Sequence, residues 1–430
     1  MNRPPSIHIR DGRLIDPAQG IDDHLDLWLA GGRVLAVGEA PPGFEAEITL
    51  DAAGKLVCPG LIDLGVHLRE PGYEHKATIA SETRAAARGG ITTLICMPDT
   101  DPVIDTPAVW ELIRRRAKAC GHARVLAAGA LTRDLAGQRL AEMGALQAAG
   151  CVAVTNDRRP LADTLVARRA LEYARTFDLP VLLCSEDPHL KGKGVAHEGA
   201  VATRLGLPGI PAAAETVAVA RDLALTEHTG CRSHFHTLST GRAAEMIAQA
   251  QHADRRISAD VAVHQLFLLE TDVDGFRAEC RVDPPLRTHS DREQLRRAVA
   301  EGVIEVICSD HQPHEADAKA EPFPATAPGI SGLETLLPLT LKLVDEGVMD
   351  LPRAIARLTV GPARVLGLDL GHLAPGASAD LCIIDPEAVW TFRATEMASA
   401  GHNTPFDGWE FRGRVTHTLF EGRITHRLEP

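Results

Sequence analysis

Hydrophobic residues in the middle of the chain form short runs that alternate with longer amphipathic stretches. The runs predict eight strands, at 61–66, 91–96, 125–128, 152–155, 181–184, 234–238, 257–261 and 303–308. Helical periodicity falls between them, at 78–88, 107–119, 162–177, 213–228, 241–252 and 290–301. This alternation predicts an α/β fold, a (β/α)8 TIM barrel over residues 57–369. An open doubly wound sheet is the alternative, but no Gly-x-Gly-x-x-Gly turn or phosphate-binding loop favours it.

The two ends of the chain follow a different pattern. Residues 6–55 alternate apolar and polar positions between Gly and Asp turns, and residues 378–427 resume the same alternation. Such a pattern is typical of short antiparallel strands. Because the two segments flank one long barrel, we expect them to pair into a small composite β-sandwich domain, formed by residues 1–56 and 370–430.

The composition of the chain argues against several classes of protein. The chain has 430 residues and a formal charge of −13, which argues against a general binder of nucleic acid or of anionic membranes. It contains no apolar stretch of about 18 residues that would span a membrane, and its start lacks a signal-peptide core. The nine cysteines are scattered without a Cys-x-x-Cys pair, which predicts reduced thiols and a cytoplasmic location.

The end of the first predicted barrel strand carries the most informative chemistry. Chemistry in a TIM barrel is found at the carboxyl ends of the strands. Side chains alternate along a strand, so Gly65 and His67 share one side. A hydrolytic metal site would place an imidazole at both positions, and only His67 supplies one. The segment therefore indicates the frame of a metal-dependent hydrolase with an incomplete ligand set.

Ordered segments along the chain carry a family resemblance. Residues 59–63 (Pro-Gly-Leu-Ile-Asp) and 67–72 (His-Leu-Arg-Glu-Pro-Gly) resemble the opening of the dihydroorotase family, within the amidohydrolase superfamily. Similar segments follow in the family's order, at 96–100, 185–188, 238–240, 283–287, 309–314, 327–334 and 403–406. The resemblance spans the whole chain and implies a TIM barrel, a composite β domain and a link to de novo pyrimidine biosynthesis. It is strongest to the non-catalytic homologue that associates with aspartate transcarbamoylase.

The resemblance also implies where a zinc centre would lie. Active bacterial members hold zinc through a His-x-His pair, an Asp after strand 4, a His on each of strands 5 and 6, and an Asp on strand 8. The ligand positions kept here are His67, Asp157 and Asp310. The ligand positions replaced are Gly65, Cys184 and Thr237. The kept residues could still bind one zinc ion, since three protein ligands and a water are the usual catalytic count, and Cys184 could add a thiolate. We favour the other hypothesis, in which these residues bond to one another.

Two positions on the substrate side carry an acidic residue where the family has a neutral one. Arg69 and His314 match its substrate-binding residues, whereas Asp99 and Asp283 replace the usual asparagines. An arginine fork suits a substrate carboxylate, and a carboxylate at position 99 would repel such an anion. Asp310, the family's general base, is kept, but without an activated water it is expected to be vestigial.

His236 precedes the strand-6 ligand position by one residue. On a regular strand its side chain points to the face opposite Thr237, so we expect it to pack against the surrounding helices. A β-bulge would instead turn it inward, where it could substitute for the missing ligand.

Two hypotheses of function follow. In the first, the chain is a catalytically inactive dihydroorotase homologue that scaffolds the catalytic chain of aspartate transcarbamoylase, forms a homodimer and needs no cofactor. In the second, it is a mononuclear zinc dihydroorotase or related cyclic amidohydrolase that hydrolyses a cyclic amide C–N bond and holds at most one zinc ion. Neither hypothesis involves nucleic acid or a membrane. A hydantoinase is a weaker third option, because residues 68–72 look more like dihydroorotase.

Overall fold

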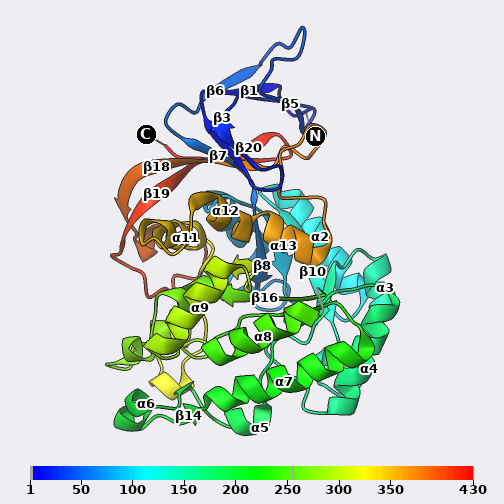
Figure 1. The fold of residues 1–430 in the computed structure, drawn as a ribbon, viewed down its shortest axis with the longest axis vertical. Helices are drawn as coiled ribbons and strands as arrows, with labels where there is room; N and C mark the ends of the chain where they lie inside the picture. Colours follow the sequence, from blue (N-terminus) through cyan, green and yellow to red (C-terminus); the bar gives the residue numbers. More distant parts are fainter. Residues whose placement is uncertain (1–2, 254–255, 430) are drawn as a thin grey trace.

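An eight-stranded parallel barrel forms the centre of the computed structural model, which describes residues 3–253 and 256–429 (Figure 1). The strands follow one another around the sheet as β8 (Leu61–Val66), β9 (Ile91–Cys96), β10 (Arg124–Ala130), β11 (Ala153–Thr155), β12 (Val181–Leu183), β15 (Ser233–Phe235), β16 (Ile257–Ala262) and β17 (Val306–Cys308). Backbone hydrogen bonds between His311 and residues 65 and 67 close the barrel, at 2.9 and 3.0 Å. The predicted TIM barrel is confirmed.

Six helices pack around the barrel where the helical periodicity predicted them. They are α1 (Ile79–Arg88), α2 (Pro107–Cys120), α4 (Thr164–Thr176), α7 (Ala212–Thr229), α8 (Gly241–Ala253) and α9 (His289–Glu301). Helices that the periodicity did not predict include α11 (Leu336–Asp345), α12 (Leu351–Leu358) and α13 (Val360–Leu366). Helix α4 shows why such segments fold. Asp163 caps it by accepting backbone N–H bonds from Leu165 and Val166. Its buried residues recur at helical spacing, as Ala167, Ala170, Leu171 and Ala174.

Two sheets at one end of the molecule are built from both ends of the chain (Figure 1). The first contains β5 (Arg33–Val37), β4 (Leu27–Ala30), β1 (Ile7–Arg10) and β6 (Ile48–Asp51). The second contains β20 (Arg423–Arg427), β19 (Glu410–Phe420), β18 (Leu381–Thr391), β7 (Leu56–Pro59), β2 (Arg13–Asp16) and β3 (Ile21–His24). One hydrophobic cluster, which includes Ile7, Leu29, Val57 and Leu381, draws on both sheets. The exact domain boundaries stay a prediction.

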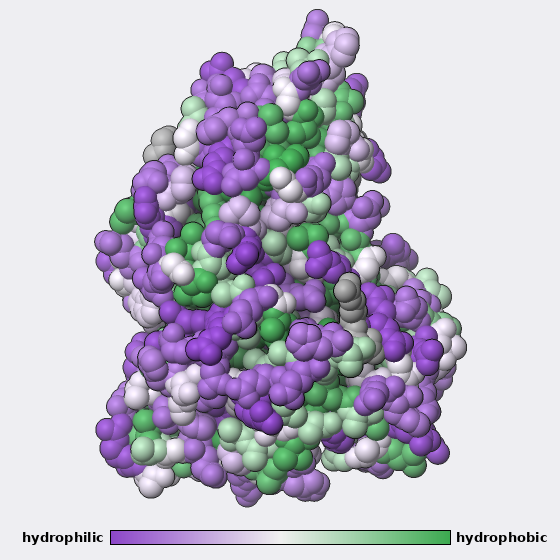
Figure 2. All heavy atoms as spheres, viewed as in Figure 1, coloured by the Kyte–Doolittle hydropathy of each residue, from purple (hydrophilic) through white to green (hydrophobic). Residues whose placement is uncertain are grey.

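The surface is mostly polar. Figure 2 shows charged and polar side chains over most of one face, with smaller apolar patches between them. Within residues 3–253 and 256–429, no helix has the length and apolar character needed to cross a bilayer.

Candidate active site

Three ligand positions keep an unusual backbone conformation. Asp157, Thr237 and Asp310 follow the ends of β11, β15 and β17, and their φ angles are 50°, 55° and 48°. A positive φ is tolerated by aspartate but is a true outlier for a β-branched residue such as threonine. Strain of this kind persists where the surroundings impose it, and it clusters at functional sites. Thr237 therefore shares the left-handed backbone of the two aspartates, although its side chain is not a carboxylate or an imidazole.

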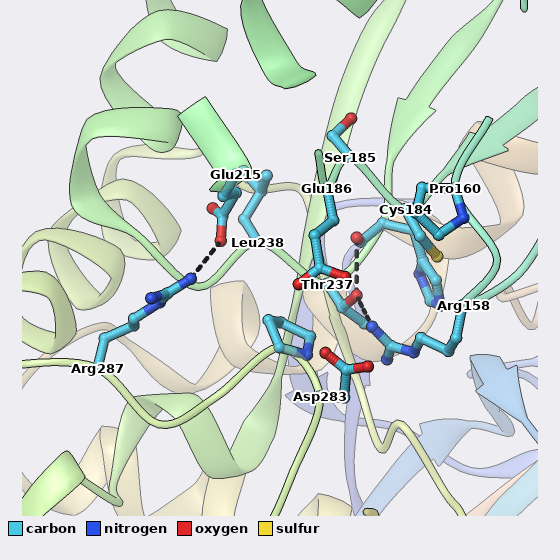
Figure 3. A pocket seen from close by; sticks show the side chains of 12 residues that line it. Arg158, Pro160, Cys184, Ser185, Glu186, Glu215, Thr237, Leu238, Asp283 and Arg287 are labelled. Atoms are coloured by element: carbon cyan, nitrogen blue, oxygen red, sulfur yellow. Dashed lines mark hydrogen bonds and ion pairs between the residues drawn. The ribbon is translucent and has the colours of Figure 1, made fainter. Parts of the chain in front are cut away.

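Arg158 lies between two of these positions, and our sequence analysis did not single it out. Its Nη1 donates a 2.8 Å hydrogen bond to Thr237 Oγ1 (Figure 3). Its Nη2 lies 2.5 Å from Asp310 Oδ1. The guanidinium thus contacts both the strand-6 and the strand-8 ligand positions. One feature of the sequence could have pointed to Arg158, because this basic residue directly follows Asp157. A basic side chain at that position faces the carboxylates at the open end of the barrel.

The charges of this ion pair stabilise each other. Burial raises the pKa of Asp310, but Arg158 and neighbouring histidines outweigh burial and lower the pKa below its ordinary value. Burial also opposes the charge of Arg158, but Asp310 and other acidic groups raise the pKa of the guanidinium well above its ordinary value. Both groups therefore stay ionised, and Asp310 is engaged as an ion-pair partner instead of being free to take a proton.

His67 and Asp157 lie close together, as predicted, and Asp99 joins them. His67 Nε2 lies 3.8 Å from Asp157 Oδ1, and its Nδ1 lies 2.8 Å from Asp99 Oδ2. The donor atoms of this group all lie within 4.8 Å of one another, so the group could hold a metal ion. Burial lowers the pKa of His67, but Asp99 and Asp157 raise it overall. A protonated imidazole has no free lone pair for a metal.

Asp310 and Cys184 do not join that group. Among the described residues, the two groups able to hold a metal contain neither of them. Cys184 follows β12 and lines a pocket beside Arg158. Burial raises the pKa of its thiol, even though Arg158 acts in the opposite direction. Because the thiolate is the form that binds zinc, the structure gives Cys184 an environment that disfavours ligation.

His236 points into the barrel, so its predicted packing against the helices is wrong. Strand β15 ends at Phe235, and the left-handed φ of Thr237 breaks the alternation on which the prediction depended. His236 Nδ1 lies 2.5 Å from Asp260 Oδ2, and His234 Nε2 lies 2.8 Å from the same oxygen. These three buried residues form the second group able to hold a metal.

The side chain of His236 fills the space beside Gly65. A Cβ built on Gly65 would lie 3.0 Å from His236 Cε1 and 3.2 Å from its Nε2. An imidazole from another strand, which is not a neighbour of β8 in the sheet, therefore lies where the first histidine of the family's pair is missing. Strand β15 supplies this ring, but Asp260 already binds its Nδ1.

Restoring the histidine at position 65 should therefore fail on its own. We expect Gly65→His to lower the free energy of unfolding by about 1–3 kcal/mol, because the new ring overlaps His236. Urea unfolding of the variant and of Gly65→Ala, which adds only the Cβ, measures the effect. Equal stability of Gly65→His and the wild type would show that His236 moves aside freely.

The substrate-side residues are also engaged with one another. Asp99 Oδ2 lies 2.9 Å from Arg69 Nη1, and Arg69 Nε donates to the carbonyl oxygen of Pro313 at 3.2 Å. His314 Nε2 lies 3.4 Å from Arg69 Nη2 and 3.0 Å from the carbonyl oxygen of Pro328. The carboxylate of Asp99 thus lies against the arginine fork that would hold a substrate carboxylate.

Asp283 lies apart from this clamp. Its Oδ2 lies 2.5 Å from Lys191 Nζ, which also contacts Glu186 Oε2 at 2.6 Å. Glu186 and Asp283 line a pocket of about 410 Å³, which is also lined by Arg158, Thr237 and Arg287 (Figure 3). The structure therefore separates the four predicted substrate-side residues into Arg69, Asp99 and His314 on one side and Asp283 on the other.

Comparisons with known proteins agree with this architecture. The profile described as "Dihydro-orotase-like" matches residues 54–243, and that of the "Amidohydrolase family" matches residues 329–426. A "Dihydroorotase-like protein" of Pseudomonas aeruginosa is 52% identical over 421 residues, covering 98% of this chain and 99% of its own. The chain belongs to the dihydroorotase-like family of the amidohydrolase superfamily.

Other relatives carry a different name. A "Dihydroorotase" of Syntrophotalea carbinolica is 48% identical and covers 98% of this chain and 99% of its own length. Among solved structures, an L-hydantoinase from Arthrobacter aurescens superposes with a TM-score of 0.88 at 24% identity, covering 98% of this chain and 96% of that one. The second similarity establishes the fold alone.

A two-zinc centre of the kind implied by the family does not fit the residues present. Asp310 is paired with Arg158, Thr237 supplies only a hydroxyl, and the space beside Gly65 is filled by His236. Zinc sites use imidazole, thiolate and carboxylate ligands. The group around His67 could hold a single ion, but it is short of nitrogen donors for two.

Proposed function

We propose that this dihydroorotase-like chain is a catalytically inactive member of its family that scaffolds the catalytic chain of aspartate transcarbamoylase in pyrimidine biosynthesis. One observation carries the loss of activity. Gly65, Cys184 and Thr237 stand at three of the six ligand positions, and a fourth, Asp310, is bound to Arg158. Without a metal centre, no water at the mouth is activated to attack a cyclic amide.

The proposed scaffold role explains a well-formed barrel around an inactive mouth. A barrel that had lost all use would be free to lose its core and its strained loops. Here three ligand positions have positive φ angles, and Arg158 forms a buried ion pair with Asp310. A surface that binds another enzyme would preserve the fold while the chemistry decays. We further propose that the chain acts as a homodimer within this assembly.

Co-expression with its cognate transcarbamoylase catalytic chain tests this function. We expect the two chains to co-elute as one large assembly on size exclusion, with transcarbamoylase turnover and no hydrolysis of dihydroorotate. The catalytic chain expressed alone is the control, and on the same column it should elute later than the assembly, as a smaller species. Separate elution, or dihydroorotate turnover at about 1–10³ s⁻¹, the usual range for enzymes, would contradict the proposal.

One observation favours a second candidate function, a mononuclear zinc cyclic amidohydrolase. The donor atoms of His67, Asp99 and Asp157 lie within 4.8 Å of one another. Three protein ligands could hold one zinc ion and leave a position for water. Metal analysis of protein purified without chelator separates the candidates. About one zinc per chain, lost together with dihydroorotate hydrolysis in Asp157→Asn, would support the second candidate.

A further inference from the structure

The barrel mouth carries a large load of buried negative charge. Asp157, Asp260 and Asp310 are 6%, 0% and 1% exposed, and they lie at or near the carboxyl ends of the strands. A buried carboxylate without a compensating cation costs several kcal/mol. In a metal-bound member of the fold, divalent ions would supply that compensation. In this chain, His234 and His236 contact Asp260, and His67 lies 3.8 Å from Asp157. Asp310 is the carboxylate that still needs a cation.

Arg158 meets this need at the same positions. One guanidinium contacts Asp310 and Thr237, which are the strand-8 and strand-6 ligand positions. In the sequence, Arg158 directly follows Asp157, which is the strand-4 ligand position. The side chain is 16% exposed and its partner Asp310 only 1%, so the pair is largely removed from solvent. Thus one side chain bridges the region in which ions would be held.

We propose that Arg158 is the resident cation of this barrel and takes the place of the metal ions. This role rests on the proposed loss of the metal centre but is independent of any partner chain. An arginine cannot be deprotonated in a protein, so the positive charge is permanent. It is also covalently attached, so the mouth is complete when the chain folds. The barrel then needs no metal for stability.

The same cation excludes a metal. A divalent ion that approaches Asp310 must displace a guanidinium already bound to that carboxylate and must overcome its positive charge. Arg158 Nε and Nη atoms offer donors only, so the side chain cannot become a ligand itself. The wild-type chain is therefore expected to stay free of zinc at this position even when zinc is abundant.

Zinc binding by the full-length chain tests this role. The wild type, Arg158→Gly and the matched control Arg159→Gly are each dialysed against zinc chloride, and bound zinc is measured by elemental analysis. Arg159 is the exposed neighbour that bonds to the carbonyl oxygen of Asp134. We expect Arg158→Gly to bind zinc at least tenfold more tightly than the wild type and the control. Zinc should also raise its melting temperature, and chelator should reverse the rise.

Three outcomes would overturn the role of Arg158. They are equal zinc affinity in all three proteins, stoichiometric zinc in the wild type, and an Arg158→Gly melting temperature that zinc leaves unchanged. If Arg158→Gly does not fold, the stability of Arg158→Met with Asp310→Asn tests the charge compensation instead, since this double variant removes both charges. That double variant should fold, and failure to fold would count against the proposal. These readouts differ from co-elution with transcarbamoylase, so the two proposals can fail separately.

Discussion

Arg158→Met is expected to lower the free energy of unfolding by about 3–5 kcal/mol. Methionine keeps much of the bulk of the side chain but leaves Asp310 buried without its cation. The cost is that of an uncompensated buried charge, and it exceeds the loss of an ordinary hydrogen bond, about 0.5–1.5 kcal/mol. Urea unfolding at neutral pH, followed by circular dichroism, measures the difference.

A double-mutant cycle identifies the cause of that loss. Asp310→Asn removes the buried charge, so Arg158→Met in its presence should cost about 1 kcal/mol or less. Arg158→Lys keeps the charge but not the planar fork, and should fall between the wild type and Arg158→Met. Arg159→Met serves as the exposed neighbour and should change stability by less than about 0.5 kcal/mol. Equal losses in both backgrounds would refute a charge effect.

Asp99→Asn is expected to make the chain bind dihydroorotate at least about a hundredfold more tightly than the wild type. In the wild type, Asp99 lies 2.9 Å from Arg69 Nη1 and occupies the fork that would bind a ligand carboxylate. A like charge next to a desolvated anion costs several kcal/mol, and each 1.4 kcal/mol corresponds to a factor of ten. Isothermal titration calorimetry with dihydroorotate measures both affinities.

Asp283→Asn is the matched control for Asp99→Asn. It makes the same exchange of carboxylate for amide, but Asp283 pairs with Lys191 and not with Arg69. Its effect on dihydroorotate binding should therefore be less than tenfold. Equal gains from both variants would show that total charge matters and that the contact with Arg69 does not.

The difference in stability between the wild type and Asp99→Asn should decrease as the pH falls. Burial raises the pKa of Asp99, but His67 and Arg69 outweigh burial and lower it to about 2. A depressed carboxyl pKa contributes stability above the pKa of the unfolded chain, near 4. That contribution is lost as pH falls through the folded pKa. The wild type should therefore exceed the variant in stability at pH 6–7 and approach it as pH falls toward about 2.

Together these variants test two side chains at the barrel mouth, each of which takes the place of a bound ligand. Arg158 lies where cations would be bound, and Asp99 lies where a substrate carboxylate would be bound. Each side chain carries a charge of the same sign as the ligand whose place it takes. A mouth completed in this way requires neither metal nor substrate to be stable, which fits the proposed role as a scaffold.

The sequence by itself determined the barrel, because strand and helix periods are local properties of the chain. The predicted strand at 61–66 matches β8, and the predicted helix at 213–228 lies within α7. It also determined that donors are absent at Gly65 and Thr237, since a residue's chemistry does not depend on the fold. His67 and Asp157 could be paired in advance because both follow barrel strands.

Only the tertiary structure decided which side chains meet in the mouth. Alternation along β15 placed His236 outward, but a left-handed φ at Thr237 ends that alternation, and no pattern in the chain reports it. The contact of Arg158 with Asp310 joins residues 152 positions apart. Such a contact depends on the direction of a long, flexible side chain and on which carboxylates lack another partner. Packing, and not local sequence, resolves both.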